Sequence, residues 1–156
     1  MHNSLLKRIW LATTLLVCLA ASPVAMTESD DAYAAARDEI WAKEQAIYKA
    51  RSQGDLSYYR QNASKGYKGW APYSEKPGGL TYLKNMAEDM LGQDQEELTM
   101  ELDDFALSGD TAVIYYSTHR TRMPNGDPAD QRYAICHVWT HEPEGWKLIG
   151  AMGREK

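Results

Sequence analysis

Four strand-like runs fill the second half of the chain, at residues 96–107, 110–123, 130–141 and 146–154. Apolar and polar side chains alternate along them, which is the period of a β-strand and not that of a helix. The runs are joined by turn-forming residues: Ser108-Gly109-Asp110, Pro124-Asn125-Gly126-Asp127-Pro128 and Glu142-Pro143-Glu144-Gly145. Asn-Gly is the strongest short signal for a β-hairpin. The pattern predicts a four-stranded antiparallel meander.

The first half of the chain has a helical period instead. Residues 30–53 place apolar side chains at helical spacing, and Gly54 ends the helix. Shorter helices are predicted over 55–62 and 80–91, whereas residues 62–79 hold four glycines and two prolines and are expected to be irregular. Helices followed by a meander predict an α+β domain, with the N-terminal helices packed on one face of an antiparallel sheet.

Residues 1–25 have the pattern of a secretory signal peptide. Lys7 and Arg8 precede an uncharged apolar run from Ile9 to Ala21, and small residues follow it. Because a membrane anchor needs about 20 apolar residues, a cleaved leader is favoured over an anchor. The folded domain is then residues 26–156, the protein is secreted or periplasmic, and no membrane attachment is expected after cleavage.

The net charge of the chain and the spacing of its histidines argue against a nucleic-acid partner and against a metal site. The formal net charge is -5, which argues against a nucleic-acid partner. His137 and His141 share one face of a predicted strand but stand about 13 Å apart along an extended chain, too far to bind one metal ion. We interpret the histidines as surface or interface residues, and no metal site or cofactor is expected. After cleavage Cys136 is the only cysteine, so a packed core must stabilise the domain.

Both faces of the predicted sheet are apolar or aromatic, where a sheet with one wet face would alternate cleanly. We expect the helices to cover the row formed by Arg132, Ala134, Cys136 and Val138. The helices would then leave bare the other row of the same strand, which is Tyr133, Ile135, His137 and Trp139. A second copy of the chain would cover this row, so a homodimer is predicted.

Several short motifs, in order along residues 30–154, resemble the SnoaL-like branch of the nuclear transport factor 2-like superfamily, in particular domain of unknown function 4440. The motifs are Ile40-Trp41-x-x-Glu44, Gly54-Asp55, Tyr67-x-Gly69-Trp70, Gly109-Asp110-x-Ala112, Arg132-Tyr133 and Gly145-Trp146-Lys147-Leu148-Ile149. The resemblance implies a cone-shaped fold in which helices close over a curved sheet around a pocket, and it implies dimers. The catalytic residue sets of the related isomerases and cyclases are not reproduced here.

Glu44 is the best catalytic candidate, because apolar residues surround it on the predicted helix. Its neighbours three and four positions away are Ile40, Trp41, Ile47 and Tyr48. A carboxyl group that faces a pocket is placed for proton transfer. The alternative is an ionised carboxylate paired with an arginine. Arg132 is the predicted partner, since two opposite charges aimed into one apolar space should meet.

The residues expected to line the pocket are Trp41, Glu44, Tyr48, Trp70, Arg132 and Met152. Met152 enters through the resemblance, because it stands where many relatives have a histidine. Trp70 belongs to residues 64–79, which we predict to form a lid over the pocket. The alternative is that the aromatic residues of this segment plug the cone as additional core.

Two functions of different classes follow. The first is an exported pocket protein that binds a small apolar or aromatic ligand, with at most a weak isomerase-, cyclase- or lyase-type activity. The alternative is a non-catalytic dimeric association module whose cone is plugged by its own side chains. An open cavity of a few hundred cubic ångströms would favour the first function. Whether the protein is an enzyme is left open by the sequence.

Overall fold

The computed structural model describes residues 24–156, with side chains from Asp30 onward. The predicted signal peptide, residues 1–25, lies outside the described part except for its last two positions. The elements are α1 (Val24–Arg51), α2 (Ser57–Asn62), β1 (Ala63–Trp70), α3 (Leu80–Asp89), β2 (Glu97–Ser108), β3 (Thr111–Arg122), β4 (Pro128–Glu142) and β5 (Gly145–Glu155). Within this described part, no helix is long and apolar enough to cross a membrane.

The predicted meander is confirmed. Strands β2, β3, β4 and β5 pair in sequence, each antiparallel to the next. Gly109, Gly126 and Gly145 in the three connectors have positive φ angles of 56°, 92° and 100°, a backbone conformation that favours glycine at tight turns. The hairpin signals in the sequence therefore located all three turns of the meander.

The prediction that residues 62–79 are irregular is wrong for their first half. Residues 63–70 form β1, which pairs in parallel with β5 at the edge of the sheet, from Ala63 opposite Leu148 to Trp70 opposite Met152. Two glycines lower the strand propensity of this segment. The strand forms because β5 supplies a partner that is distant in sequence, which local patterns do not reveal.

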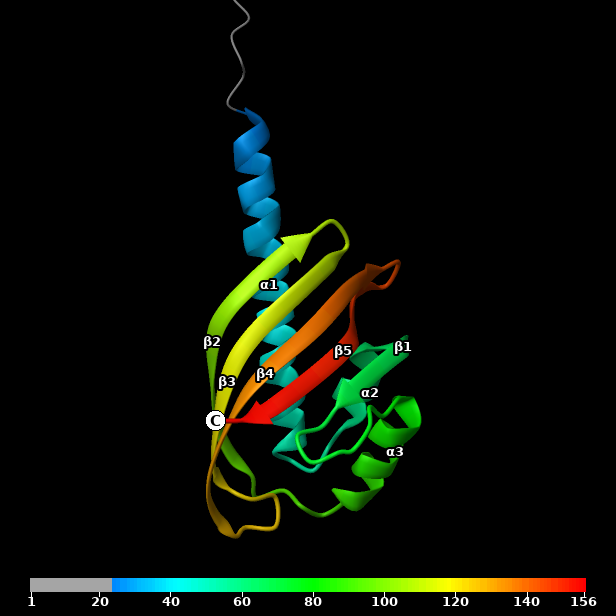
Figure 1. The fold of residues 1–156 in the computed structure, drawn as a ribbon, viewed down its shortest axis with the longest axis vertical. Coiled ribbons are helices and arrows are strands. Elements are labelled where there is room, and N and C mark those ends of the chain that lie inside the picture. The colour runs from blue at the N-terminus through cyan, green and yellow to red at the C-terminus, as the bar shows by residue number, and fades with distance from the viewer. Residues whose placement is uncertain (1–23) are drawn as a thin grey trace, which may run out of the picture.

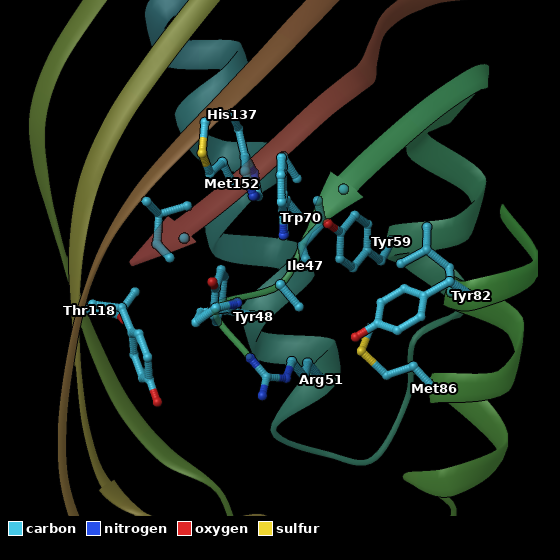
Figure 2. A pocket seen from close by; sticks show the side chains of 18 of the residues that line it. Ile47, Tyr48, Arg51, Tyr59, Trp70, Tyr82, Met86, Thr118, His137 and Met152 are labelled. Carbon is cyan, nitrogen blue, oxygen red and sulfur yellow. The ribbon is translucent and has the colours of Figure 1, made fainter. Parts of the chain in front are cut away.

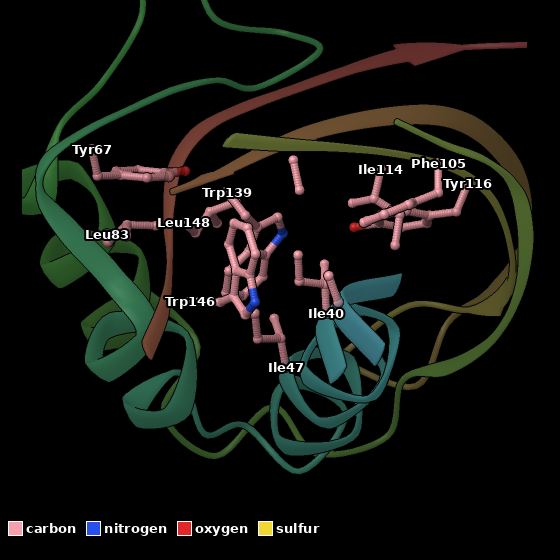
Figure 3. Close-up of a cluster of buried hydrophobic side chains, with 12 residues drawn as sticks. Ile40, Ile47, Tyr67, Leu83, Phe105, Ile114, Tyr116, Trp139, Trp146 and Leu148 are labelled. Atoms are coloured by element: carbon pink, nitrogen blue, oxygen red, sulfur yellow. The ribbon is translucent and has the colours of Figure 1, made fainter. Parts of the chain in front are cut away.

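The sheet arches around α1, while α2 and α3 lie beside β1 at one end of the arch (Figure 1). Figure 3 shows Ile40 and Ile47 of α1 under this arch, among the buried aromatic and aliphatic side chains of the strands. Ile40, Ile114, Tyr116, Trp139 and Leu148 are each fully buried. The predicted α+β class, with N-terminal helices packed on a curved, mainly antiparallel sheet, is confirmed.

The two faces of β4 are the reverse of those predicted. Tyr133, His137 and Trp139 are buried on the face that covers the helices, whereas the side chain of Arg132 is 58% exposed. Both rows of this strand are apolar, so alternation alone did not distinguish them, and burial of the larger aromatic area is the more favourable choice. The bare aromatic row that motivated the predicted dimer therefore does not exist.

Candidate functional site

A cavity of about 290 Å³ opens between α1, α3, β1 and the concave face of the sheet (Figure 2). Aromatic and aliphatic side chains form most of its wall. They include Ile47, Tyr48, Tyr59, Tyr67, Trp70, Tyr82, Leu83, Met86, Tyr133, Ile135 and Met152. A concave, mainly apolar space of this size is typical of a small-molecule site. The cone is therefore open and not plugged.

Glu44 lies behind one wall of the cavity, fully buried, and accepts three hydrogen bonds. Its Oε1 accepts from His137 Nδ1 at 2.8 Å and from Trp139 Nε1 at 2.7 Å, and its Oε2 accepts from the Tyr116 hydroxyl at 2.9 Å. A buried carboxylate is tolerated only when it is satisfied in this way. The four side chains form one polar network inside an otherwise apolar core.

His137 connects this network to the cavity. Its Nδ1 faces Glu44 and its ring forms part of the cavity wall, which Figure 2 shows next to Met152. A carboxylate that accepts from Nδ1 fixes the tautomer of the ring. Nε2 is then the nitrogen that is left to accept a proton or a hydrogen bond from a molecule in the cavity.

Three of the predicted pocket residues line the cavity, namely Tyr48, Trp70 and Met152. Trp70 is 47% exposed at the rim, and its indole Nε1 donates to the carbonyl of Ser74 at 2.7 Å. Trp41 instead packs against Tyr116 in the core, with ring centroids 5.7 Å apart. The segment predicted as a lid is thus in part an edge strand.

The predicted contact between Glu44 and Arg132 is wrong. Arg132 lies on the convex face of the sheet, where its guanidinium is 3.7 Å from the carboxylate of Asp130. Glu44 is paired with His137 instead. The cause is the reversal of the two β4 rows, because a change of one position moves a side chain to the opposite face of the sheet.

The charged end of the cavity was not predicted from the sequence. Arg51, from the last turn of α1, and Arg120, near the end of β3, both line it. Both contact the buried carboxylate of Glu96. Arg51 follows Ile47 and Tyr48 by one helical turn, so its position on the inward face was a usable signal. The inward position of Arg120 could not be predicted in this way, because it depends on which face of the sheet the helices cover.

Burial keeps the phenols of this region protonated. Loss of solvent raises the pKa of Tyr48 and, more strongly, that of Tyr59, and it raises the pKa of Tyr67 to about 12. The hydroxyl groups of Tyr59 and Tyr67 are 2.8 Å apart. At neutral pH the cavity therefore presents Tyr48 and Tyr59 as hydrogen-bond donors and not as phenolates.

We expect the protein to lose stability in alkaline solution as Tyr67 ionises. Because its folded pKa of about 12 lies above the ordinary value of 10.0, the unfolded chain releases this proton first. The stabilising contribution, about 2–3 kcal/mol, is complete below pH 10 and is lost as the pH rises toward 12. Urea unfolding at several pH values would measure it, and Tyr67→Phe should flatten this dependence, whereas an unchanged slope would contradict the assignment.

Metal ligands are not gathered here. Among residues whose side chains are described, no group of three His, Cys, Asp or Glu is placed to hold a metal ion.

The same architecture occurs in many solved structures. An NTF2-like protein with a cystatin-like fold from Novosphingobium aromaticivorans has a TM-score of 0.69 at 12% identity, covering 87% of this chain and 91% of that chain. A proposed dehydratase of the NTF2-like family from Streptomyces avermitilis has a TM-score of 0.67 at 17% identity, covering 76% and 94%. The CaMKII hub of S. rosetta has a TM-score of 0.64 at 20% identity, covering 75% and 94%.

Neither a protein-family model nor a curated protein matches the sequence. At these levels of identity the solved structures have the fold in common with this chain, and they do not assign it an activity. The arched sheet, the helices under it and the cavity between them agree with what the sequence motifs led us to expect. The chain has the nuclear transport factor 2-like fold.

Proposed function

We propose that the protein is an exported pocket protein of the SnoaL-like type that binds a small aromatic molecule and transfers a proton within it. The observation that carries this proposal is the open aromatic cavity of about 290 Å³ with His137 in its wall and Glu44 behind it. A histidine that served only to stabilise the core would not need to line a cavity. The alternative of a plugged association module is disfavoured because the cone is open.

His137 is the proposed general base. Its Nε2 takes a proton from an acidic C–H of the bound molecule, for example one next to a carbonyl, and the electron pair moves to the carbonyl oxygen. A phenol of Tyr48 or Tyr59 is placed in the same cavity to donate a hydrogen bond to that oxygen. Return of the proton to a different atom completes an isomerase-type reaction, whereas loss of a leaving group gives a lyase-type reaction.

Binding is tested by titration of the protein with 2-naphthol, followed by fluorescence or thermal shift. Met86→Trp should fill the cavity, because Met86 is half-buried in its wall, and should weaken binding at least tenfold. Leu91→Trp adds the same ring at a surface position that is 75% exposed and should leave binding unchanged. Equal binding by the two variants would show that the ligand does not enter this cavity.

Proton transfer is tested separately with 2-tetralone, an aromatic ketone with acidic C–H bonds. The protein should accelerate exchange of these hydrogens for deuterium, as followed by NMR. His137→Gln can still donate to Glu44 but lacks the base, so we expect the exchange to slow by about 10²–10⁴-fold while binding persists. Exchange that continues at the original rate in this variant would contradict the role of His137.

We further propose that two copies associate through the convex face of the sheet. Its strands carry Val113, Tyr115, Cys136, Val138 and Ile149, of which Tyr115 is 41% and Ile149 37% exposed. Burial raises the pKa of the Cys136 thiol, so this residue acts as a small apolar group. These residues form an apolar strip across neighbouring strands, which a second copy would cover.

Sedimentation velocity at micromolar concentration should show a dimer. Tyr115→Arg places a charge in the middle of the strip and should give a monomer, whereas Gln45→Arg, on the exposed face of α1, should remain dimeric. A monomeric mass for the unmodified protein would contradict the proposed association.

A further inference from the structure

The cavity has one end at which two arginines lie. Arg51 and Arg120 belong to its wall, and the residues that line it include no aspartate or glutamate. Figure 2 shows Arg51 projecting from α1 beside Tyr48. The guanidinium of Arg51 lies 5.6 Å from the centre of the Tyr48 ring, and that of Arg120 lies 5.8 Å from the centre of the Tyr133 ring.

Glu96 is shared by the two arginines and neutralises only one of them. Its Oε1 is 2.7 Å from Arg120 Nε and 3.2 Å from Arg51 Nη2. The remaining contact of Arg120 is with the neutral amide of Gln131, at 2.8 Å. Two positive charges and one negative charge leave this cluster, of which Glu96 and Arg120 are buried, with an excess of one positive charge. The carboxylate of Glu44 is not part of this cluster, because its contacts are with His137, Trp139 and Tyr116.

One donor in this cluster is also unsatisfied. Arg51 Nε is buried and has no hydrogen-bond partner in the described part of the chain, and Glu96 Oε2 likewise lacks one. Buried guanidinium nitrogens are nearly always hydrogen-bonded, because a lost partner costs free energy. The excess positive charge of two arginines that line one cavity indicates the chemistry of what binds there.

We propose that the ligand of this cavity carries a carboxylate, which binds to Arg51 and Arg120 while its aromatic body lies against the tyrosines toward His137. The inference rests on the proposed function and names the ligand class as a small aromatic carboxylic acid. A planar guanidinium offers paired N–H donors that match the two oxygens of a carboxylate. The bound anion neutralises the excess charge of the cluster.

The test compares 2-naphthoate with 2-naphthamide, which have nearly the same shape but differ in charge. Calorimetric titration of the unmodified protein should show the carboxylate binding at least tenfold more tightly than the amide. Arg51→Gln should abolish this preference by weakening the binding of naphthoate and leaving naphthamide within twofold. Arg122→Gln is the matched control, since it removes the same charge from a residue that pairs with Glu97 at 3.1 Å outside the cavity wall.

The outcomes separate this inference from the proposed function. If both compounds bind the unmodified protein equally, the carboxylate inference fails and the aromatic pocket stands. If neither compound binds, both fail. Should Arg51→Gln not fold, Arg51→Lys keeps the charge but loses the paired donors, and a preference at least threefold smaller than that of the unmodified protein supports the inference. An unaltered preference in either variant overturns the role of Arg51.

Discussion

Replacing Glu44 with alanine is expected to reduce the free energy of unfolding by about 3–5 kcal/mol, because three buried donors lose their acceptor together. The side chain is completely buried and accepts from His137, Trp139 and Tyr116. All three donor residues are buried as well. The variant also leaves a cavity where the carboxyl group was.

Glu44→Gln separates the hydrogen bonds from the charge. The amide oxygen can still accept from His137 and Trp139, and the amide nitrogen can donate to Tyr116, whose hydroxyl rotates to accept. We therefore expect a smaller loss, about 1–2 kcal/mol. Glu39→Ala is the control, since this residue lies on the same helix, 53% exposed, with only a 3.7 Å contact to Lys43, and should lose less than about 0.5 kcal/mol.

Urea unfolding of the three variants would measure these differences. Similar losses for Glu44→Ala and Glu39→Ala would contradict the network that the structure shows. The glutamine variant also reports on function. Since its amide still accepts from Nδ1 of His137, it should retain ligand binding, whereas proton transfer should slow because the imidazolium that forms on His137 is no longer stabilised by a carboxylate.

The meander and the burial of Glu44 could be predicted because each rests on local information. Turn residues such as Asn125-Gly126 fix hairpins without reference to the rest of the chain. Glu44 lies within an apolar stripe on a long helix, so its side chain had to enter the core wherever the helix packed. In both cases a few residues close together in the sequence were enough for the prediction.

The partners of Glu44 could not be predicted in the same way. Both rows of β4 are apolar, and the choice between Arg132 and His137 as the inward residue depended on which face the helices cover. The inward face is the one that buries the larger apolar area against α1. Trp139, which is fully buried, belongs to that face. One wrong face assignment then placed the arginine in the core and the histidine on the surface.

The strand β1 and the charged cluster were missed for a related reason. β1 is a parallel edge strand that pairs with β5, which lies about eighty residues later in the chain. Arg51, Glu96 and Arg120 come from three separate elements. Contacts of this kind arise only when the arch closes over α1, and no spacing within a single element encodes them.

Glu96→Gln is expected to be as damaging as Glu44→Ala, because it leaves the buried Arg120 and the partly buried Arg51 without a counter-charge. Glu96→Gln should reduce the free energy of unfolding by about 3–5 kcal/mol. Glu97→Gln is the matched control. It is the adjacent residue, it is 61% exposed, and its single ion pair is with Arg122, so its loss should stay below about 1 kcal/mol.

A ligand that carries the missing charge should reverse part of this loss. In Glu96→Gln the cluster has an excess of two positive charges and a more open set of donors on Arg51 and Arg120. Saturating 2-naphthoate should therefore raise the melting temperature of this variant more than that of the unmodified protein, and 2-naphthamide should not distinguish them. Combining Glu96→Gln with Arg51→Gln should remove this additional stabilisation, because the excess falls back to the single charge of Arg120 and the donors of Arg51 are lost. Equal stabilisation of all three proteins by naphthoate would show that the carboxylate does not bind at these arginines.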